Sequence, residues 1–328
     1  MKKILRKTKR LTALLAENAW RRISGQPRVY GVTGHSAWSV RLDDVARIRQ
    51  RFKGPHARRR NDLVVSLTTY PARFKLLPYS LFSLVSQTIQ PQRIVVWLTE
   101  SDVPQGEEGL PAELLDFRRW GVEFRFYKKA IRSYTKIIPS LEAFPDSILL
   151  TVDDDHYYSP KLFERLLDAH DRHPEMIHAN RMHRVRMSND TYVPYRQWQK
   201  GDRCLKDTRG SFWNLLLGYG GVVYPPHVFD SRVLDSEKFM RLAPGQDDLW
   251  LWANALSLGV KVAGLARPLW PNPLADPENR DKLMQQSLQN ENIYGDGNDR
   301  AIAALEAEYG LAAILQGESS DTKMEVWK

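Results

Sequence analysis

The sequence predicts an α/β fold with a mostly parallel, Rossmann-like sheet and helices on both faces. Short apolar, β-branched segments alternate with amphipathic segments between residues 62 and 152, which is typical of strands joined by crossover helices. The segments end at turn residues: Pro71 stops "DLVVSLTTY", and Gly121 follows "PAELLDFRRW". With 328 residues and a hydrophobic content of 42%, the chain is long and apolar enough to bury a large core.

The first half of the chain contains four expected strands separated by helices. The strands are expected at residues 62–70, 93–99, 122–127 and 147–152, and the helices at 76–89, at 111–121 and from 133 onward. The fourth strand, "SILLTV", ends directly at three consecutive aspartates. Ligands of parallel sheets bind at the carboxyl ends of strands, so this position favours a functional role for the aspartates.

The second half is less regular. Ser159 and Pro160 are expected to open a helix over 160–174, as N-cap and first-turn residue. The stretch 178–245 is irregular and holds "GYGGVVYPP", a glycine turn leading into a short strand. A strong helix and then a strand are expected in "DDLWLWANALSLGVKV", and Asn298 is expected to cap a helix over 298–310.

The texture of the sequence divides the chain into three parts. We expect a basic N-terminal arm at 1–61, a central domain at 62–265 whose halves are 62–160 and 161–265, and a C-terminal extension with a helix at 266–328.

The N-terminal arm is strongly basic. Residues 1–22 hold eight Lys or Arg and one Glu, and Ile4, Leu11, Leu15 and Ala19 fall roughly on one helical face. Such a helix can lie on an anionic membrane surface; a solvated arm is the alternative. Nucleic acid is not expected as a partner, because the basic runs lack interleaved aromatic residues.

The composition also bears on the compartment. No apolar stretch approaches the ~20 residues that span a bilayer, and no convincing secretory signal is present. Cys204 is the only cysteine, so no internal disulfide can form and a reducing compartment fits. We expect a cytoplasmic protein, with the arm able to hold it at the inner face of the cell membrane.

The aspartate triplet (Asp153, Asp154 and Asp155) lies in "LLTVDDDHYYSP". Neighbouring carboxylates repel one another, so a positive partner is expected, and a divalent cation is the first candidate. Asp153 and Asp155 form an alternating pair that can present oxygen ligands to Mn²⁺ or Mg²⁺. An acidic turn or capping cluster is the alternative reading.

A second acidic pair, Asp247 and Asp248, opens the helix in "APGQDDLWLW". Acidic residues are favoured at helix N-termini by the helix dipole, so capping alone can explain them. The functional alternative is a general base that faces the metal site and removes a hydroxyl proton.

These motifs together resemble a known family. "VVSLTTYPARF", "SLFSLVSQTIQPQRIVVWL", "TVDDDHYYSP", "GYGGVVYPP" and "QDDLWLWANALSLGV" occur in the order seen in GT-A-fold glycosyltransferases. The chain is most similar to the family-2-like bacterial enzymes of surface-polysaccharide (capsule or lipopolysaccharide) assembly, over residues 62–265. The resemblance implies inverting, metal-dependent transfer of a sugar from a nucleotide-sugar donor, UDP-linked, to a glycan or lipid-linked glycan.

The resemblance also implies roles for particular residues. Asp248 matches the base, with Asp247 beside it, and Asp155 matches the usual ligand of Mn²⁺ or Mg²⁺, assisted by Asp153. The implied donor and nucleotide site consists of Thr68, Tyr70, Arg73, Lys136, Asp153, Asp154, Gly220 and Gly221. Pro71 and the turn "WLTESD" depart from the family pattern, which leaves the base of the nucleotide undetermined.

Other readings of the same residues remain open. A nucleotidyltransferase on a related fold would need a glycine-rich first turn, and "TTYPARF" has none. A non-catalytic glycan-binding protein on a degenerate GT-A fold would bind sugar without turnover. Trp213 and Tyr219 either stack on a sugar or belong to the core. The basic cluster of His178, Arg181, His183 and Arg184 either meets a phosphorylated acceptor or forms a solvated face.

Overall fold

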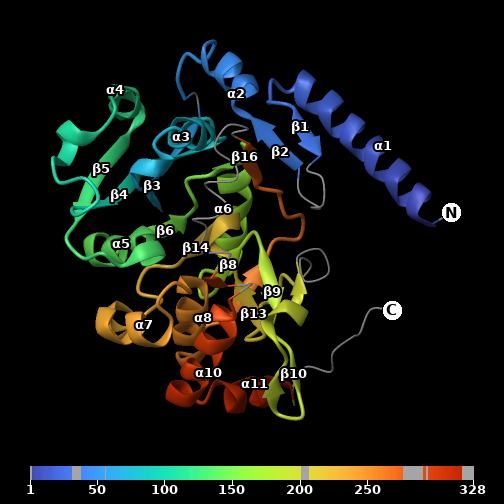
Figure 1. The fold of residues 1–328 in the computed structure, drawn as a ribbon, viewed down its shortest axis with the longest axis vertical. Helices are drawn as coiled ribbons and strands as arrows, with labels where there is room; N and C mark the ends of the chain where they lie inside the picture. Colours follow the sequence, from blue (N-terminus) through green and yellow to red (C-terminus); the bar gives the residue numbers. More distant parts are fainter. Residues whose placement is uncertain are drawn as a thin grey trace.

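The protein is described by a computed structural model over residues 2–31, 38–55, 57–200, 207–275, 291–292 and 295–319. Its centre is a seven-stranded sheet of order β15-β8-β14-β6-β3-β4-β5 (Figure 1). The strands are β3 (Arg58–Thr68), β4 (Ile89–Thr99), β5 (Val122–Tyr127), β6 (Ile148–Thr151), β8 (Ile177–Ala179), β14 (Val222–Tyr224) and β15 (Val262–Gly264). β14 runs antiparallel to β6 and β8, and the other neighbouring pairs are parallel. The expected mostly parallel α/β sheet is therefore confirmed.

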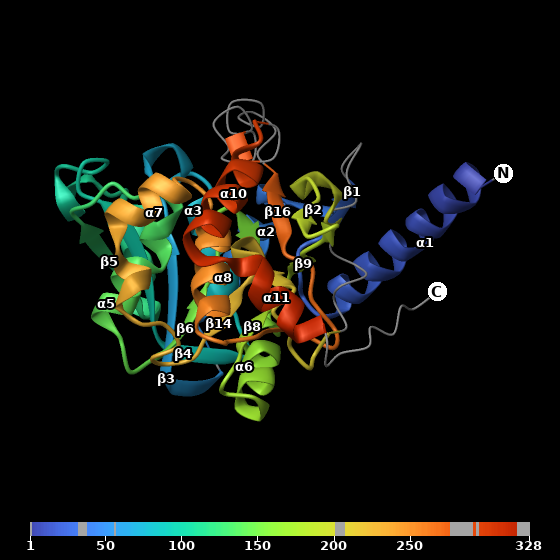
Figure 2. The same ribbon diagram turned by 90° about the horizontal axis from the view of Figure 1, so that it is seen from below.

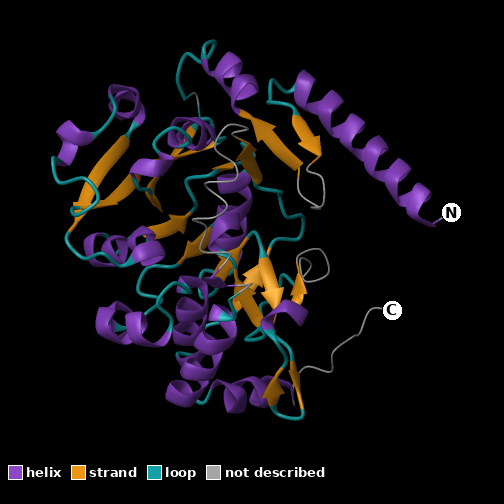
Figure 3. Cartoon of the chain, in the orientation of Figure 1, coloured by secondary structure: helices purple, strands orange, loops and turns teal. Residues whose placement is uncertain are grey.

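Helices cover both faces of this sheet (Figure 3). Side chains alternate between the faces along each strand, so Val64 and Leu149 enter one core while Val65 and Leu150 enter the other. The first core is closed by α5 (Ile138–Ala143), α7 (Ser236–Leu242), α8 (Asp247–Ser257), α10 (Gly297–Tyr309) and α11 (Leu311–Ser319). The second is closed by α2 (Leu42–Arg49), α3 (Leu77–Val85), α4 (Ala112–Leu115) and α6 (Leu162–Arg172).

Most expected elements are present with shifted ends. β3 and β4 begin at residues 58 and 89, several residues before the expected starts, and α3 is correspondingly shorter than the expected helix. The expected helix at 111–121 is α4 followed by a 3₁₀ helix (Asp116–Trp120) that ends at Gly121, whose φ of 82° explains the glycine.

Two capping expectations are wrong. α6 begins at Leu162 after Lys161, so Ser159 and Pro160 lie before it. The hydroxyl of Ser83 and the amide of Gln87 bind the backbone around residues 158–163 and fix the entry of the chain instead. Asn298 lies inside α10, which starts at Gly297 after Asp296.

The irregular stretch after β8 forms short strands beside the main sheet. A three-stranded sheet joins β12 (Gln199–Lys200), β9 (Met182–Arg184) and β13 (Asn214–Leu216), and a hairpin joins β10 (Met187–Ser188) to β11 (Thr191–Tyr192). Cys204 lies outside the described residues.

The N-terminal segment and the segment after β15 meet in a further sheet. Its strands, in order, are β1 (Val29–Gly31), β2 (Trp38–Arg41), β16 (Asn272–Ala275) and β7 (His156–Tyr157). The backbone N–H of Leu274 also donates to the carbonyl of Asp155 at 2.9 Å. Both terminal segments therefore support the strand that directly follows the aspartate triplet.

Helix α1 (Lys2–Ile23) extends away from the body (Figures 1 and 2). Its last turns are fixed to the body: Asn18 exchanges two hydrogen bonds with the backbone of Val29, and Arg21 donates to the carbonyl of Pro27. On the other side, Leu15 and Ile23 are 62% and 87% exposed. Among the described residues, no helix is both long enough and apolar enough to cross a bilayer.

Candidate active site

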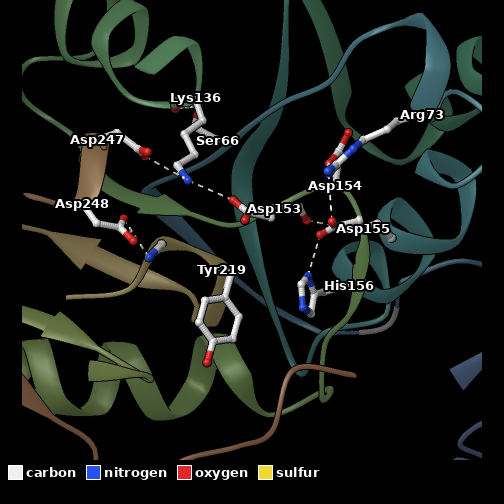
Figure 4. A network of polar contacts seen from close by, with 12 residues as sticks. Ser66, Arg73, Lys136, Asp153, Asp154, Asp155, His156, Tyr219, Asp247 and Asp248 are labelled. Carbon is white, nitrogen blue, oxygen red and sulfur yellow. Dashed lines mark hydrogen bonds and ion pairs between the residues drawn. The ribbon is translucent and has the colours of Figure 1, made fainter. Parts of the chain in front are cut away.

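The two acidic groups singled out in the sequence meet at one edge of the main sheet, although about 90 residues separate them. The aspartate triplet follows the carboxyl end of β6, and Asp247 and Asp248 open α8. The ammonium group of Lys136 lies between them, 2.9 Å from Asp153 Oδ1 and 3.1 Å from Asp247 Oδ2 (Figure 4). One cation therefore joins the end of β6 to the start of α8.

Lys136 is held deep in the protein, with its side chain only 8% exposed. The hydroxyl of Ser66 on β3 donates to the carbonyl of Lys136 at 2.5 Å and fixes the backbone. Burial disfavours the charged amine, but Asp153 and Asp247 outweigh that cost and raise the pKa of Lys136 above its ordinary value. Lys136 is therefore a permanent cation whose charge offsets the acidic groups around it.

Arg73 and His156 neutralise the other two carboxylates of the triplet. Arg73 Nη1 lies 2.5 Å from Asp154 Oδ1 and 2.9 Å from Asp155 Oδ2, and Thr69 donates to Asp154 Oδ2 at 2.6 Å. His156 Nδ1 lies 2.6 Å from Asp155 Oδ1. Burial opposes the charge on Asp155, but His156 and Arg73 lower the pKa of that carboxyl, whereas burial raises the pKa of Asp154 to about 6.

The three carboxylates of the triplet have different partners. Asp154 and Asp155 share Arg73, while Asp153 turns toward Lys136 (Figure 4). The positive partners expected from the sequence include three side chains of this chain.

Asp248 differs from Asp247 in its surroundings. Its Oδ1 accepts a hydrogen bond of 2.9 Å from the backbone N–H of Gly218, and the residue is partly exposed, whereas Asp247 is buried. Burial, and next the charge of Asp247, raises the pKa of Asp248 to about 8. A partly exposed carboxyl with a raised pKa can accept a proton from a bound hydroxyl.

A glycine turn at residues 218–221 lies beside Lys136 and Asp248. A Cβ at Gly218 would lie 2.7 Å from Lys136 Nζ and 2.9 Å from Asp248 Oδ1, so a side chain would displace both. Gly221 has a φ of 94° and lies against Leu162, which gives it a packing role. Between them, Tyr219 faces His156, with ring centroids 5.5 Å apart.

The donor set of the triplet is compatible with a hard divalent ion that substrate oxygens also bind. Asp153 and Asp155 have side chains 29% and 30% exposed, and both offer carboxylate oxygens. Mg²⁺ is usually bound by one or two carboxylates together with substrate phosphates. Within the described part of the chain, no group of three or more His, Cys, Asp or Glu side chains is placed to hold a metal ion.

The remaining residues expected in the site make separate contacts. The hydroxyl of Thr68 donates to the Trp97 carbonyl at 3.0 Å, and the guanidinium of Arg73 lies 5.5 Å from the centre of the Tyr70 ring. Trp213 packs against the core. The four residues of the expected basic cluster contact separate partners. His178 contacts the His173 carbonyl, and His183 contacts the Tyr195 hydroxyl. Arg184 contacts Asp207 and Asn214, and Arg181 contacts the Trp270 ring.

Three site residues were not anticipated from the sequence. Thr69 and His156 bind carboxylates of the triplet, and the Tyr158 hydroxyl accepts a hydrogen bond of 2.8 Å from the backbone N–H of Asp153. His156 and Tyr158 lie within three residues of the triplet, so proximity was the available signal. Thr69 carried none, because its contact spans 85 residues.

Comparison with known proteins gives a distant likeness. No protein-family model matches the chain, and no curated protein sequence matches it. Among solved structures, TarS residues 1–349 from S. aureus in complex with UDP-GlcNAc is 14% identical, with a TM-score of 0.43, over 66% of this chain and 59% of that one. The mannosyltransferase PcManGT from Pyrobaculum calidifontis, in complex with GDP-Man and Mn²⁺, is 11% identical, with a TM-score of 0.47, over 86% of this chain and 83% of that one.

The chain thus spans less than two thirds of the TarS chain.

Replacing Lys136 with Met should destabilise the fold in a pH-dependent way. The variant leaves Asp153 and Asp247 without their shared cation, which typically costs about 3–5 kcal/mol in a buried site. Burial penalises the charged form of an unpaired carboxylate. The loss should therefore be smaller at pH 5 than at pH 8, because a lower pH favours the neutral form.

Urea unfolding of the wild type and of Lys136→Met at pH 5 and pH 8 measures the loss in free energy of unfolding. Adding Asp247→Asn to the Lys136→Met variant removes one unpaired charge and should recover part of the stability at pH 8. An equal loss at both pH values would show that Lys136 acts through packing and not through charge.

Proposed function

We propose that this protein is a glycosyltransferase that moves a sugar from a nucleotide-sugar donor, UDP-linked, to a hydroxyl of a glycan or lipid-linked glycan. One observation carries the proposal: the aspartate triplet and the Asp247–Asp248 pair converge on Lys136 at the carboxyl edge of the parallel sheet. The resemblance to GT-A enzymes implies a donor site at the triplet and a base at Asp248. The observed geometry supports this proposal, with the two on opposite sides of one cation.

The donor is proposed to bind along the edge formed by β3, β6 and the glycine turn. Thr68, Tyr70 and Arg73 follow or flank the end of β3, where a nucleotide can lie, and Lys136 provides a positive charge near its diphosphate. The stem of Arg181 fills the space beside Gly220, so this glycine is left out of the proposed donor contacts. A divalent ion such as Mn²⁺ or Mg²⁺, held by Asp155 and assisted by Asp153, would supply Lewis-acid stabilisation of the departing diphosphate.

Asp248 is proposed to act as the general base. It takes the proton of the acceptor hydroxyl while that oxygen forms a bond to the anomeric carbon of the donor sugar. The bond between the anomeric carbon and the diphosphate oxygen breaks, and the nucleoside diphosphate leaves with the electron pair. This single displacement inverts the anomeric configuration, and the alignment of both reactants supplies much of the acceleration.

Asp248→Asn should reduce turnover by about 10²–10⁴-fold, the usual contribution of a general base, while the fold persists. The measurement is release of the donor nucleotide, a nucleoside diphosphate from UDP-, GDP- and dTDP-sugars and CMP from CMP-sugars, with glycan and glycolipid fractions of the source cells as acceptors. Asp146→Asn, at a side chain 87% exposed, is the matched control and should retain activity. Retained turnover in Asp248→Asn would exclude this residue as the base.

Asp247→Asn should move the acidic limb of the kcat/KM profile to lower pH. Burial and then the charge of Asp247 raise the pKa of Asp248 to about 8, so removing that charge lowers the pKa and lets Asp248 accept protons at lower pH. The pH–rate profiles of the two proteins test this. A limb that stays in place, or moves to higher pH, would mean that another group controls the reaction.

The proposed pathway is bacterial surface-polysaccharide biosynthesis, with the enzyme in the cytoplasm at the inner face of the membrane. Helix α1 supports the membrane contact. Its body-facing side carries Leu14, Asn18 and Arg21, whereas Leu15, Trp20 and Ile23 are exposed on another side. Exposed apolar side chains on a basic helix can enter the interface of an anionic bilayer.

Leu15→Asp combined with Ile23→Asp should abolish flotation of the protein with anionic liposomes. The melting temperature should not change, because both side chains are exposed. Leu258→Asp, at an exposed apolar position outside α1, is the control and should float like the wild type. Equal flotation of all three proteins would exclude α1 as the membrane contact.

A further inference from the structure

Arg181 is a buried arginine, and no acidic side chain among the described residues pairs with it. It follows the carboxyl end of β8 and is only 3% exposed. Its Nε and Nη1 atoms are buried and have no hydrogen-bond partner. Two nearby arginines do have polar partners. Arg73 pairs with Asp154 and Asp155, and Arg184 contacts Asp207 and Asn214.

The position of Arg181 is fixed by its neighbours. Its side-chain stem lies directly against Gly220, where an added Cβ would come within 2.3 Å of the arginine Cγ. Its carbonyl accepts a hydrogen bond of 3.0 Å from Leu217. The preceding Asn180 bonds the carbonyl of Gly220 and both backbone groups of Leu269, so the residues on either side of Arg181 are held in place.

The guanidinium stacks on the Trp270 ring, 3.9 Å from the ring centre. Stacking stabilises the face of the guanidinium through a cation–π interaction. It provides no acceptors for the N–H donors, which lie at the edge of the plane. A desolvated charge with unbonded donors is unfavourable unless a partner compensates for it, so the edge of this guanidinium is prepared for an anion.

Arg181 lies at the same edge of the sheet as the candidate active site. β8 runs in the same direction as β6, because both are antiparallel to β14. The glycine turn connects the two regions: Gly218 contacts Asp248 and Lys136, and Gly220 contacts Arg181. Trp270 lies two residues before β16, which pairs with β7 at His156. The arginine and Asp248 thus lie against the two ends of one short glycine turn, Gly220 and Gly218.

We propose that Arg181 binds an oxyanion, a phosphate or carboxylate, carried by the sugar acceptor. This inference rests on the proposed transferase function and names the class of its acceptor. A guanidinium edge recognises both oxyanions through paired N–H donors. The donor diphosphate is assigned to the triplet side, where Lys136 and Arg73 lie, and the acceptor must approach Asp248 from elsewhere. Arg181, at the other end of the glycine turn, can orient an anionic acceptor with its hydroxyl toward that carboxylate.

The test is calorimetric binding to the full chain and its variants. Glucose 6-phosphate probes for a phosphate, glucuronate for a carboxylate, and glucose is the neutral control. UDP and GDP with Mn²⁺ report the donor site separately. The variants are Arg181→Lys, which keeps the charge but loses the planar fork, and Arg181→Met, which keeps most of the stem. Arg184→Met is the matched control, since that arginine already has partners.

The expected result is that one of the two anionic sugars binds the wild type and glucose does not. Binding should weaken about 10- to 100-fold in Arg181→Met, as expected for lost hydrogen bonds to a charged group. It should weaken less in Arg181→Lys and should not change in Arg184→Met. Nucleotide affinity should be the same in all four proteins.

Three results would overturn the inference: no anionic sugar binds the wild type, the anionic sugar binds Arg181→Met equally well, or Arg181→Met loses nucleotide affinity. The last would place Arg181 in the donor site. If the wild type binds no nucleotide but binds an anionic sugar through Arg181, the transferase proposal fails and the oxyanion site stands.

Discussion

The buried ammonium group of Lys136 is the interaction on which the candidate site depends. It joins Asp153, at the end of a central strand, to Asp247, at the start of α8. Without it, two carboxylates would face each other in a desolvated region, which is unfavourable. The lysine is positioned by Ser66 on β3, so the central strands and α8 together determine the distance between the two acidic groups.

The charges of the site form two compensated sets. Lys136 pairs with Asp153 and Asp247. Arg73 pairs with Asp154 and Asp155, and His156 pairs with Asp155. Asp248 is outside both pairings, and burial and the neighbouring charge of Asp247 raise its pKa. The same glycine turn that leaves room for Lys136 also donates its backbone N–H to Asp248. The glycine turn therefore contacts both Lys136, which holds the ion pairs, and Asp248, the candidate base.

The fold was predictable because it follows from local patterns. Apolar β-branched runs predicted the strands from β3 to β6, and their alternation with helices predicted parallel pairing. The partners of the carboxylates were less predictable, since they come from distant elements: Thr69 and Arg73 approach the triplet across about 80 residues. The basic cluster expected around Arg181 does not form. Residues that are neighbours in sequence lie on or near short strands there, and their side chains contact different partners.

The most direct test of the account is whether a donor nucleotide binds at the aspartate triplet. Thermal melting with UDP, GDP, dTDP and CMP, each with and without Mn²⁺, measures this for the wild type and for Asp155→Asn. Ligands that bind only the folded state raise its melting temperature. The account predicts a rise with one nucleotide that Mn²⁺ enlarges and that Asp155→Asn abolishes. No rise with any nucleotide, or an equal rise in both proteins, would contradict it.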